Sequence, residues 1–357
     1  MKALIIGYGS TGKSFERYLT KKSIKFDIFD ENTAKLYDKK NILGDIKTNK
    51  ILEYTKLYVS PGIDLRKYLS FETISELNYE TDLDIFFKEN KSIKIGVTGT
   101  NGKSTLVHYL NQALNYVSSS IALGNIGNPL LDNIKHKNKY SVIEASSFQL
   151  EKMKDNNFDF SFITNIQSDH IDFHRNFENY KNAKLKICSE MGQTVFCQDD
   201  SYKEIAINFA SQIESVNLSK DITFTNLPFR LETISKGVFN DSKSTNSASL
   251  LYALNKLNFK GNLIICGDPK KENYKKLEIK GPKRIFIFGH HKKELSKLIS
   301  HPNITICNKL HEILKILRSE EGSHDLLFSP GNPSGNDYVN YIERGEHFSK
   351  LRAEYLD

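Results

Sequence analysis

The stretch Ile93–Thr105, which reads IKIGVTGTNGKST, constrains the fold of this chain more than any other part of its sequence. Its apolar start predicts a buried strand, and the segment LVHYLNQAL that follows carries apolar residues at helical spacing. A glycine loop between a strand and a helix N-terminus lets backbone N–H groups and a partial positive charge meet a polyphosphate. Lys103 adds a full positive charge, and a serine or threonine hydroxyl beside it can complete a Mg²⁺ shell.

These features predict a P-loop for a nucleoside triphosphate. Its ligand-binding residues would be Gly99, Thr100, Asn101, Gly102, Lys103, Ser104 and Thr105. The common spacing G-x-x-x-x-G-K-[ST] would place a glycine at position 97, where this chain has Val97. The alternative is a simple glycine turn beside an exposed lysine.

The composition is that of a soluble protein with two or three domains. None of its apolar runs approaches the ~20 residues needed to cross a bilayer. The N-terminal sequence MKALIIGYGSTGKS loses its apolar character too early for a secretory signal. We therefore expect a cytoplasmic protein with no membrane partner.

The cysteines and the charge also limit the function. No C-x-x-C spacing indicates a zinc site or a disulfide framework among Cys188, Cys197, Cys266 and Cys307. The formal net charge of +7 comes from scattered lysines, without the basic and aromatic stripe of a nucleic-acid interface. We expect small phosphorylated substrates and no nucleic acid, and nothing in the sequence requires more than a monomer.

A second glycine motif lies at the N-terminus. The apolar residues 2–7 predict a strand, and Gly7–Gly12 reads G-x-G-x-x-G before a predicted helix. A second predicted strand ends at Asp30, an acidic residue about twenty positions later, as in dinucleotide-binding units. NAD and a nucleotide diphosphate-sugar fit this motif equally well in physical terms. A plain glycine turn that packs a helix on a strand is the alternative.

Two further strand ends carry candidate metal ligands. Glu144 ends the apolar run YSVIE, where an acid that positions magnesium belongs, although a solvated strand end would look the same. His170 and His174 lie in the segment DHIDFH, which fits a transition-metal hydrolase, a hard-metal site beside the P-loop, or a polar loop that caps a helix. Of these we favour the hard-metal site. Lys184 lies in the next predicted helix and, on composition alone, is a surface lysine.

The last third of the sequence alternates predicted strands and helices, which is typical of a doubly wound parallel sheet. The run from Phe196 to Asn226 is polar and weakly patterned, and the break at Leu227 precedes this region. The fold class is therefore α/β, with three consecutive domains, each built on a mostly parallel sheet. We place them at residues 1–83, 84–227 and 228–357, as a Rossmann-like domain, a P-loop domain and a second Rossmann-like domain.

Taken together, the motifs resemble the Mur ligase family along nearly the whole chain. They are the N-terminal fingerprint, TGTNGKST, GNIGNP, EASSFQL, DHxD, NDSKSTN and a C-terminal ERGxxF. Within that family, the fingerprint and NDSKSTN resemble the member that adds D-glutamate. The resemblance implies ATP-dependent amide formation through an acyl-phosphate in peptidoglycan precursor synthesis, with UDP-N-acetylmuramoyl-L-alanine and D-glutamate as substrates.

The resemblance also implies roles for individual residues. Catalysis and two Mg²⁺ ions would involve Lys103, Ser104, Glu144, His170 and Lys184, with Lys184 carbamoylated to become a magnesium ligand. The UDP-sugar substrate would be bound by Ser10, Thr11, Asp30, Asn125 and Ser146. ATP would also contact Arg230 and Asp241. The D-glutamate pocket would be lined by Lys243, Thr245, Lys270, Ser334 and Tyr341, the last at a position where we expect phenylalanine.

One family motif is missing. Members of the family usually carry a G-x-H-N-x-x-N segment and several helices before the L-P-x-R-x-E stretch, and here only the polar run up to Leu227 takes their place. We expect a shortened central domain and weaker or differently arranged adenine binding. The alternatives of other kinds are a folylpolyglutamate synthetase-like ligase, an NAD-dependent dehydrogenase and a non-enzymatic nucleotide switch.

Overall fold

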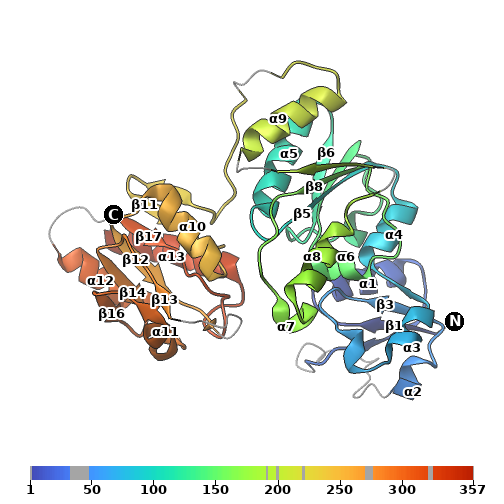
Figure 1. Cartoon of the computed structure of the whole chain (residues 1–357), viewed down its shortest axis with the longest axis horizontal. Coiled ribbons are helices and arrows are strands. Elements are labelled where there is room, and N and C mark those ends of the chain that lie inside the picture. Colours follow the sequence, from blue (N-terminus) through green and yellow to red (C-terminus); the bar gives the residue numbers. More distant parts are fainter. Residues whose placement is uncertain are drawn as a thin grey trace. The chain divides into compact units, whose positions relative to one another are not determined.

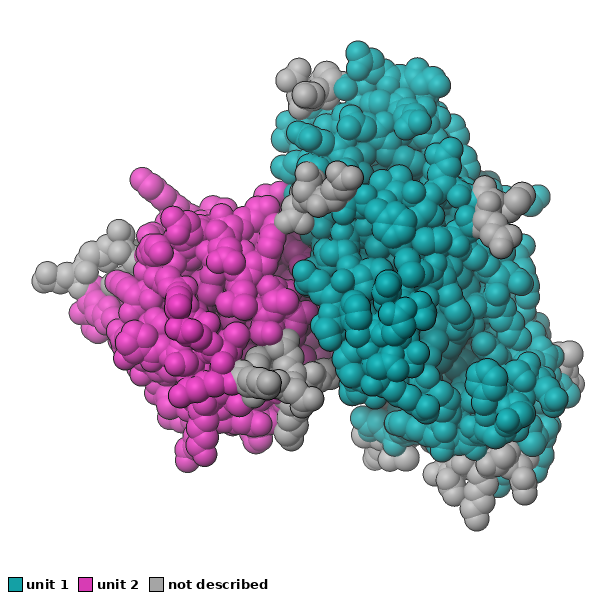
Figure 2. Space-filling view, viewed as in Figure 1, with its two compact units in different colours: residues 1–224 teal, residues 225–357 magenta. Residues whose placement is uncertain are grey.

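The computed structural model describes residues 2–32, 48–189, 192–197, 201–218, 222–269, 276–320 and 325–356. The chain forms two compact units, Met1–Phe224 (unit 1) and Thr225–Asp357 (unit 2), which Figure 2 shows in different colours. The predicted α/β class is confirmed, because three sheets of four or more strands are parallel at every pairing except one.

Unit 1 begins with a four-stranded parallel sheet of order β2-β1-β3-β4. Its strands are β1 (Ala3–Ile6), β2 (Phe26–Phe29), β3 (Lys56–Val59) and β4 (Tyr79–Glu80). Helix α1 (Ser10–Lys21) follows β1 directly and approaches it closely. A Cβ on Gly12 would lie 2.0 Å from the carbonyl oxygen of Gly7, so only glycine allows this packing. The shorter helices of this region are α2 (Thr48–Ile51), α3 (Phe71–Glu76) and a 3₁₀ helix (Leu65–Lys67).

The second sheet of unit 1 has the order β6-β7-β5-β8-β9. Its strands are β5 (Ile93–Thr98), β6 (Ser120–Gly124), β7 (Tyr140–Glu144), β8 (Phe160–Ile163) and β9 (Gln193–Phe196). Its helices are α4 (Asp82–Glu89), α5 (Lys103–Val117), α6 (Ser147–Lys152), α7 (Ile171–His174), α8 (Phe177–Leu185) and α9 (Tyr202–Ile213), with a 3₁₀ helix at Leu131–Asn133. As predicted, the P-loop joins β5 to α5.

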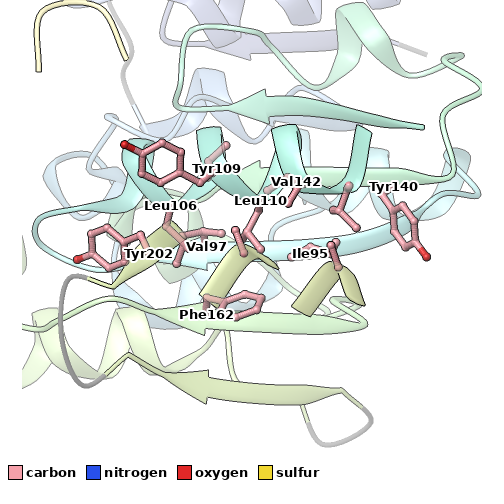
Figure 3. Close-up of a cluster of buried hydrophobic side chains, with 14 residues drawn as sticks. Ile95, Val97, Leu106, Tyr109, Leu110, Tyr140, Val142, Phe162 and Tyr202 are labelled. Atoms are coloured by element: carbon pink, nitrogen blue, oxygen red, sulfur yellow. The ribbon is translucent and has the colours of Figure 1, made fainter. Parts of the chain in front are cut away.

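Helix α9 corrects our description of residues 196–226 as weakly patterned. It packs against α5, as Figure 1 shows, and its Tyr202 joins a buried cluster with Val97 and Leu106 (Figure 3). The inner face of α9 is completed by Ala206 and Ala210, both fully buried. Ile205, Phe209 and Ile213 also pack against this cluster, so the segment carries apolar residues at helical spacing that the sequence-based description did not use.

Unit 2 contains a six-stranded sheet of order β10-β11-β17-β12-β14-β16, in which only β10 and β11 are antiparallel. Its strands are β10 (Glu232–Ser235), β11 (Val238–Asn240), β12 (Asn262–Ile265), β14 (Arg284–Ile287), β16 (Ile304–Ile306) and β17 (Leu326–Phe328). Strands β13 (Leu277–Glu278) and β15 (Ile299–Ser300) form a separate pair. The helices are α10 (Ser247–Leu257), α11 (Lys292–Leu298), α12 (Leu310–Ser319) and α13 (Tyr341–Leu356).

The alternation predicted for the last third is thus present, with β10 as an additional antiparallel edge strand. Of the domain boundaries, the one near residue 83 falls inside α4, and the one at 227 lies close to the division between the two units. Both boundaries stay predictions. Among the described residues, no helix has the length and apolar character needed to span a bilayer.

Candidate active site

A cavity of about 480 Å³ lies in unit 1 and is lined by residues that follow the carboxyl ends of strands in both of its sheets. The structure brings five residues predicted to bind the UDP-sugar to this cavity: Ser10, Thr11, Asp30, Asn125 and Ser146. Gly7, Ser60 and Pro61 also line it. Because ligands of parallel α/β sheets bind at the carboxyl ends of strands, the position of the cavity fits a substrate site.

One end of the cavity is formed by the N-terminal glycine turn. The carboxylate of Asp30 accepts hydrogen bonds from the backbone N–H groups of Tyr8 (2.6 Å) and Asn32 (2.8 Å). The hydroxyl of Ser60 donates to the carbonyl of Gly7 (2.7 Å). Side chains at the ends of β2 and β3 thus hold the turn at the start of α1, where an anion would meet the helix N-terminus.

The P-loop is held from β8. The hydroxyl of Thr164 donates to the carbonyl of Asn101 (2.5 Å), and the Asn165 side chain accepts from the Asn101 N–H (3.0 Å). On the loop side, the ammonium group of Lys103 donates to the carbonyls of Gly99 and Thr100, both at 2.9 Å. These contacts hold the loop against the end of β8, and Lys103 is folded back over it.

Gly102 is required at its position for two reasons. Its φ of +82° lies in the left-handed region, which side chains other than glycine rarely adopt. A Cβ on Gly102 would also lie 2.2 Å from the hydroxyl oxygen of Tyr202. Helix α9 therefore packs directly against the phosphate-binding loop.

Lys184 is not the surface residue that its composition suggested. Its side chain is only 2% exposed, and its ammonium group donates to the carbonyl of Gly99 (2.7 Å). Burial, followed by the nearby charge of Lys103, holds the pKa of Lys184 well below its ordinary value. The position of α8 against the P-loop produces this burial, which local sequence does not encode.

Glu144 has the environment of a metal ligand. It is 2% exposed, and its Oε1 accepts from the side-chain amide of Asn125 (3.0 Å). Its Oε2 is also buried and has no hydrogen-bond partner among the described residues. Because a buried carboxylate oxygen is costly to leave unpaired, this atom fits a site for a hard cation such as Mg²⁺.

His170 lies beside the cavity and feels the charges of Lys103 and Lys184. Its ring centroid is 4.9 Å from that of Phe148, which lines the cavity. Burial lowers the pKa of His170, and the charges of Lys103 and Lys184 add to this, while the carboxylates of Asp169 and Asp172 partly oppose it. In the described part of the chain, no three His, Cys, Asp or Glu side chains form a metal cluster by themselves.

Unit 2 holds the other predicted ligand contacts. Asp241 follows β11 and accepts from the hydroxyl of Ser329 (2.8 Å) and the backbone N–H of Leu231 (3.1 Å). Burial raises its pKa to about 6.

The ammonium group of Lys243 lies 3.7 Å from the ring centroid of Tyr341, a cation–π contact. Thr245 and Ser334 are half-buried in the loops after β11 and β17, whereas Lys270 lies outside the described residues.

Helix α13 contacts these loops through side chains on its buried face. The guanidinium of Arg344, which is fully buried, donates to the carbonyls of Ser242 (2.7 Å) and Asn332 (2.9 Å). A Cβ on Gly345 would lie 2.3 Å from the ring of Phe229, and Phe348 stacks on Phe328 at 4.6 Å. One face of α13 therefore fastens the loops after β11 and β17 to the sheet.

Comparisons with known proteins identify the family. Residues 97–273 match the Mur ligase middle domain, and residues 1–75 match the Mur ligase MurD-like N-terminal domain. The chain is 30% identical to a protein of Buchnera aphidicola subsp. Schizaphis graminum named UDP-N-acetylmuramoylalanine--D-glutamate ligase, over 99% of this chain and 98% of that relative. The chain belongs to the Mur ligase family.

Other relatives agree with this placement. Proteins of the same name from Francisella philomiragia and Thermosipho africanus are each 29% identical to the chain, over 97% and 98% of their own lengths. The alignment with the Francisella protein spans 415 positions, more than the 357 residues of this Mur ligase, so that relative carries segments that this chain lacks.

Solved structures of Mur ligases share the fold. A MurF ligase from Thermotoga maritima in complex with ADP matches with a TM-score of 0.59 and 14% identity, over 99% of this chain and 95% of that one. The UDP-N-acetylmuramate-alanine ligase MurC of the same organism matches with a TM-score of 0.53 and 15% identity, over 99% of each chain.

Some residues of this Mur ligase site were missing from the sequence-based set. The P-loop supports Thr164, Asn165 and Tyr180 were not singled out, and neither were the cavity residues Asp82 and Phe148. Their contacts are with residues far along the chain, so no local motif marks them. The only local indication was their position: Thr164 and Asn165 follow the carboxyl end of β8, and Asp82 begins α4.

Proposed function

We propose that this chain joins D-glutamate to UDP-N-acetylmuramoyl-L-alanine in an ATP-dependent, ADP-forming step of peptidoglycan precursor synthesis. The observation that carries the proposal is the presence of a P-loop and a separate cavity of about 480 Å³ in one compact unit. That unit belongs to a chain that aligns over its full length with relatives named as D-glutamate ligases. The substrates would be small molecules, and we expect a cytoplasmic monomer.

The chemistry requires activation of a carboxylate, which is a poor acyl donor. An oxygen of the alanyl carboxylate attacks the γ-phosphorus of ATP, the bond to the bridging oxygen breaks, and ADP leaves. The unprotonated amine of D-glutamate then attacks the carbonyl carbon, the C–N bond forms, a proton leaves the nitrogen, and phosphate departs. The tasks of the protein are to position the reactants and to neutralise charge.

The residues of unit 1 divide these tasks. The N-terminus of α5 and Lys103 would hold the β- and γ-phosphates, and Ser10, Thr11 and Asp30 would bind the uridine diphosphate. Asn125 and Ser146 would contact the muramoyl part. In unit 2, Arg230 and Asp241 would contact ATP, and Lys243, Thr245, Lys270, Ser334 and Tyr341 would form the D-glutamate pocket.

Ser104, Glu144 and His170 would hold Mg²⁺, together with a carbamoylated Lys184. The buried, unpartnered Oε2 of Glu144 supports this set. Bound Mg²⁺ would neutralise charge on the phosphate oxygens. A lysine whose pKa is lowered by burial loses its proton more readily, and the neutral amine is the form that adds to carbon dioxide, which supports the carbamoylation of Lys184.

Phosphate release from ATP in the presence of UDP-N-acetylmuramoyl-L-alanine tests the proposal. We expect release that depends on D-glutamate, with L-glutamate as the matched control. The same release with and without D-glutamate would reject the ligase function and favour a nucleotide switch. Fluorescence titration with NADH against competition by UDP separates the ligase from a dehydrogenase, since only the latter binds NADH at the N-terminal turn.

A further inference from the structure

Asp82, the first residue of α4, is a buried carboxylate at the wall of the cavity. It is 4% exposed, and it lines the cavity together with Gln149 of α6. Its Oδ2 accepts from the side-chain amide of Gln149 (3.1 Å), and its Oδ1 accepts from the backbone N–H of Leu83 (3.1 Å). Both carboxylate oxygens are therefore used to receive N–H donors.

The other end of the Gln149 side chain is also committed. Its Oε1 accepts from the backbone N–H of Ser146 (3.1 Å) and from the Ser146 hydroxyl (3.1 Å). Because a backbone N–H can only donate, the atom that faces it must be the amide oxygen. The NH₂ group of Gln149 must then face Asp82, and the carboxylate fixes this orientation of the amide.

This chain of hydrogen bonds determines what Ser146 can offer to a ligand. Its hydroxyl proton is donated to Gln149, and its oxygen also accepts from the backbone N–H of Gln149 (3.3 Å). Only a lone pair is left. The amide of Asn125 is fixed similarly, since its NH₂ donates to Glu144 and leaves the oxygen free of that bond.

The cavity consequently has two ends of opposite polarity. The glycine turn before α1 supplies backbone N–H donors, which suit a pyrophosphate. The wall formed by Ser146 and Asn125 supplies acceptors, which suit hydroxyl or amide N–H groups of the rest of the substrate.

We propose that Asp82 is a positioning residue that keeps the Ser146 wall of the cavity in its acceptor state and thereby selects the muramoyl-alanine part of the substrate. This inference rests on the proposed function and adds a specificity determinant to it. Burial opposes the ionised form and raises the pKa of Asp82 to about 6. Among the described residues, no cation bonds to this carboxylate, so its burial costs free energy of folding. A role in substrate recognition would explain why a carboxylate is kept at this position.

The test exchanges the hydrogen-bonding groups. In Asp82→Asn, the new amide must turn its NH₂ toward either the Leu83 N–H or the Gln149 NH₂, so one donor faces another. In the double variant Asp82→Asn/Gln149→Glu, the carboxylate and the amide exchange places, and every donor again meets an acceptor. The matched control is Asp84→Asn, since Asp84 is equally buried in α4 but accepts from Thr81 and Lys154 and does not line the cavity.

For Asp82→Asn we expect the KM for UDP-N-acetylmuramoyl-L-alanine to rise about tenfold, the effect of losing one or two hydrogen bonds. The KM for ATP and the Kd for UDP alone should stay within about twofold, since ATP would bind at the P-loop and UDP at the glycine-turn end of the cavity, away from the Ser146 wall. The double variant should recover most of the affinity, and Asp84→Asn should leave all three constants near those of the wild type.

An unchanged KM in Asp82→Asn, an equal loss for UDP and for the whole substrate, or a double variant that binds the whole substrate no better than Asp82→Asn would overturn the inference. A wild-type protein that binds UDP-N-acetylmuramoyl-L-alanine no more tightly than UDP would overturn the proposed function as well. Calorimetry with the two ligands distinguishes these results, because it requires no turnover.

Discussion

Replacing Gly102 by alanine should destabilise the P-loop through two separate effects. The first part is backbone strain, because φ at Gly102 is +82°. The second part is a collision, because the new Cβ would lie 2.2 Å from the hydroxyl oxygen of Tyr202 and 2.7 Å from its ring carbon Cζ. Tyr202 is 6% exposed within the core of unit 1, so its ring has little room to move.

The magnitudes follow from these two parts. A left-handed conformation costs a residue other than glycine about 1–2 kcal/mol, and overpacking of a core typically costs about 1–3 kcal/mol. We expect Gly102→Ala to lose roughly 3 kcal/mol, which lowers the Tm of a unit of this size by about 6–12 °C. The displaced N–H groups should also raise the Kd for ADP at least about tenfold.

Two other glycines of unit 1 provide matched controls. Gly127 has a φ of +106° but would have nothing within 4 Å of a Cβ, so Gly127→Ala should show the strain alone. Gly9 has neither a positive φ nor a neighbour within 4 Å, so Gly9→Ala should leave the Tm nearly unchanged. Calorimetric unfolding and ADP titration of the three variants separate strain from collision.

The collision also predicts a rescue. Adding Tyr202→Phe to Gly102→Ala removes the atom that the new Cβ would approach most closely, so part of the lost Tm should return. If Gly102→Ala unfolds at the same temperature as Gly127→Ala and binds ADP like the wild type, then α9 does not constrain the P-loop, and the reasoning is wrong.

Three further predictions concern the site. Lys184→Ala should abolish turnover without rescue by bicarbonate, and full turnover in this variant would exclude the metal-ligand role. Since the pKa of Asp82 is raised from its ordinary value of 3.8 to about 6, its contribution to stability is present below pH 3.8 and is lost as the pH rises through about 6. Urea unfolding should therefore show Asp82→Asn gaining about 3 kcal/mol relative to the wild type between about pH 4 and pH 7, and a pH-independent difference would contradict the burial effect. Adenine binding should be weaker than in a longer relative, and equal ADP affinities in calorimetry would disprove this.

The parts of the fold that the sequence predicted are those with local signals. The strand, loop and helix around Lys103 and the alternation in the last third follow from periodicity, glycines and helix-terminal residues. Helix α9 was overlooked although its Ile205, Phe209 and Ile213 recur at helical spacing, because polar residues flank this short apolar segment on both sides. A contact with α5, rather than propensity, decides its place.

Site residues could be predicted where a local motif marks them, and not where their role depends on a partner far along the chain. Ser10, Asn125 and Ser146 reach one cavity, as expected for a shared substrate, although their roles stay predictions. The bond between Asp82 and Gln149 joins residues 67 positions apart, and no local pattern encodes such a pair. Likewise, the burial of Lys184 arises from the packing of α8 on a loop that precedes it by 85 positions.

The buried face of α13 has a consequence for shortened forms of the protein. Loss of the final helix would leave every loop residue of the predicted D-glutamate pocket in the chain, including Lys243 and Ser334, but would remove the Arg344 guanidinium that joins two of those loops. A nonsense mutation near codon 341 would therefore yield a product that keeps its predicted substrate-contacting residues apart from Tyr341 but lacks the Arg344 bonds that align two of its loops. The sixteen residues of α13 would behave genetically as part of the active site, although Tyr341 alone among them is predicted to contact the substrate.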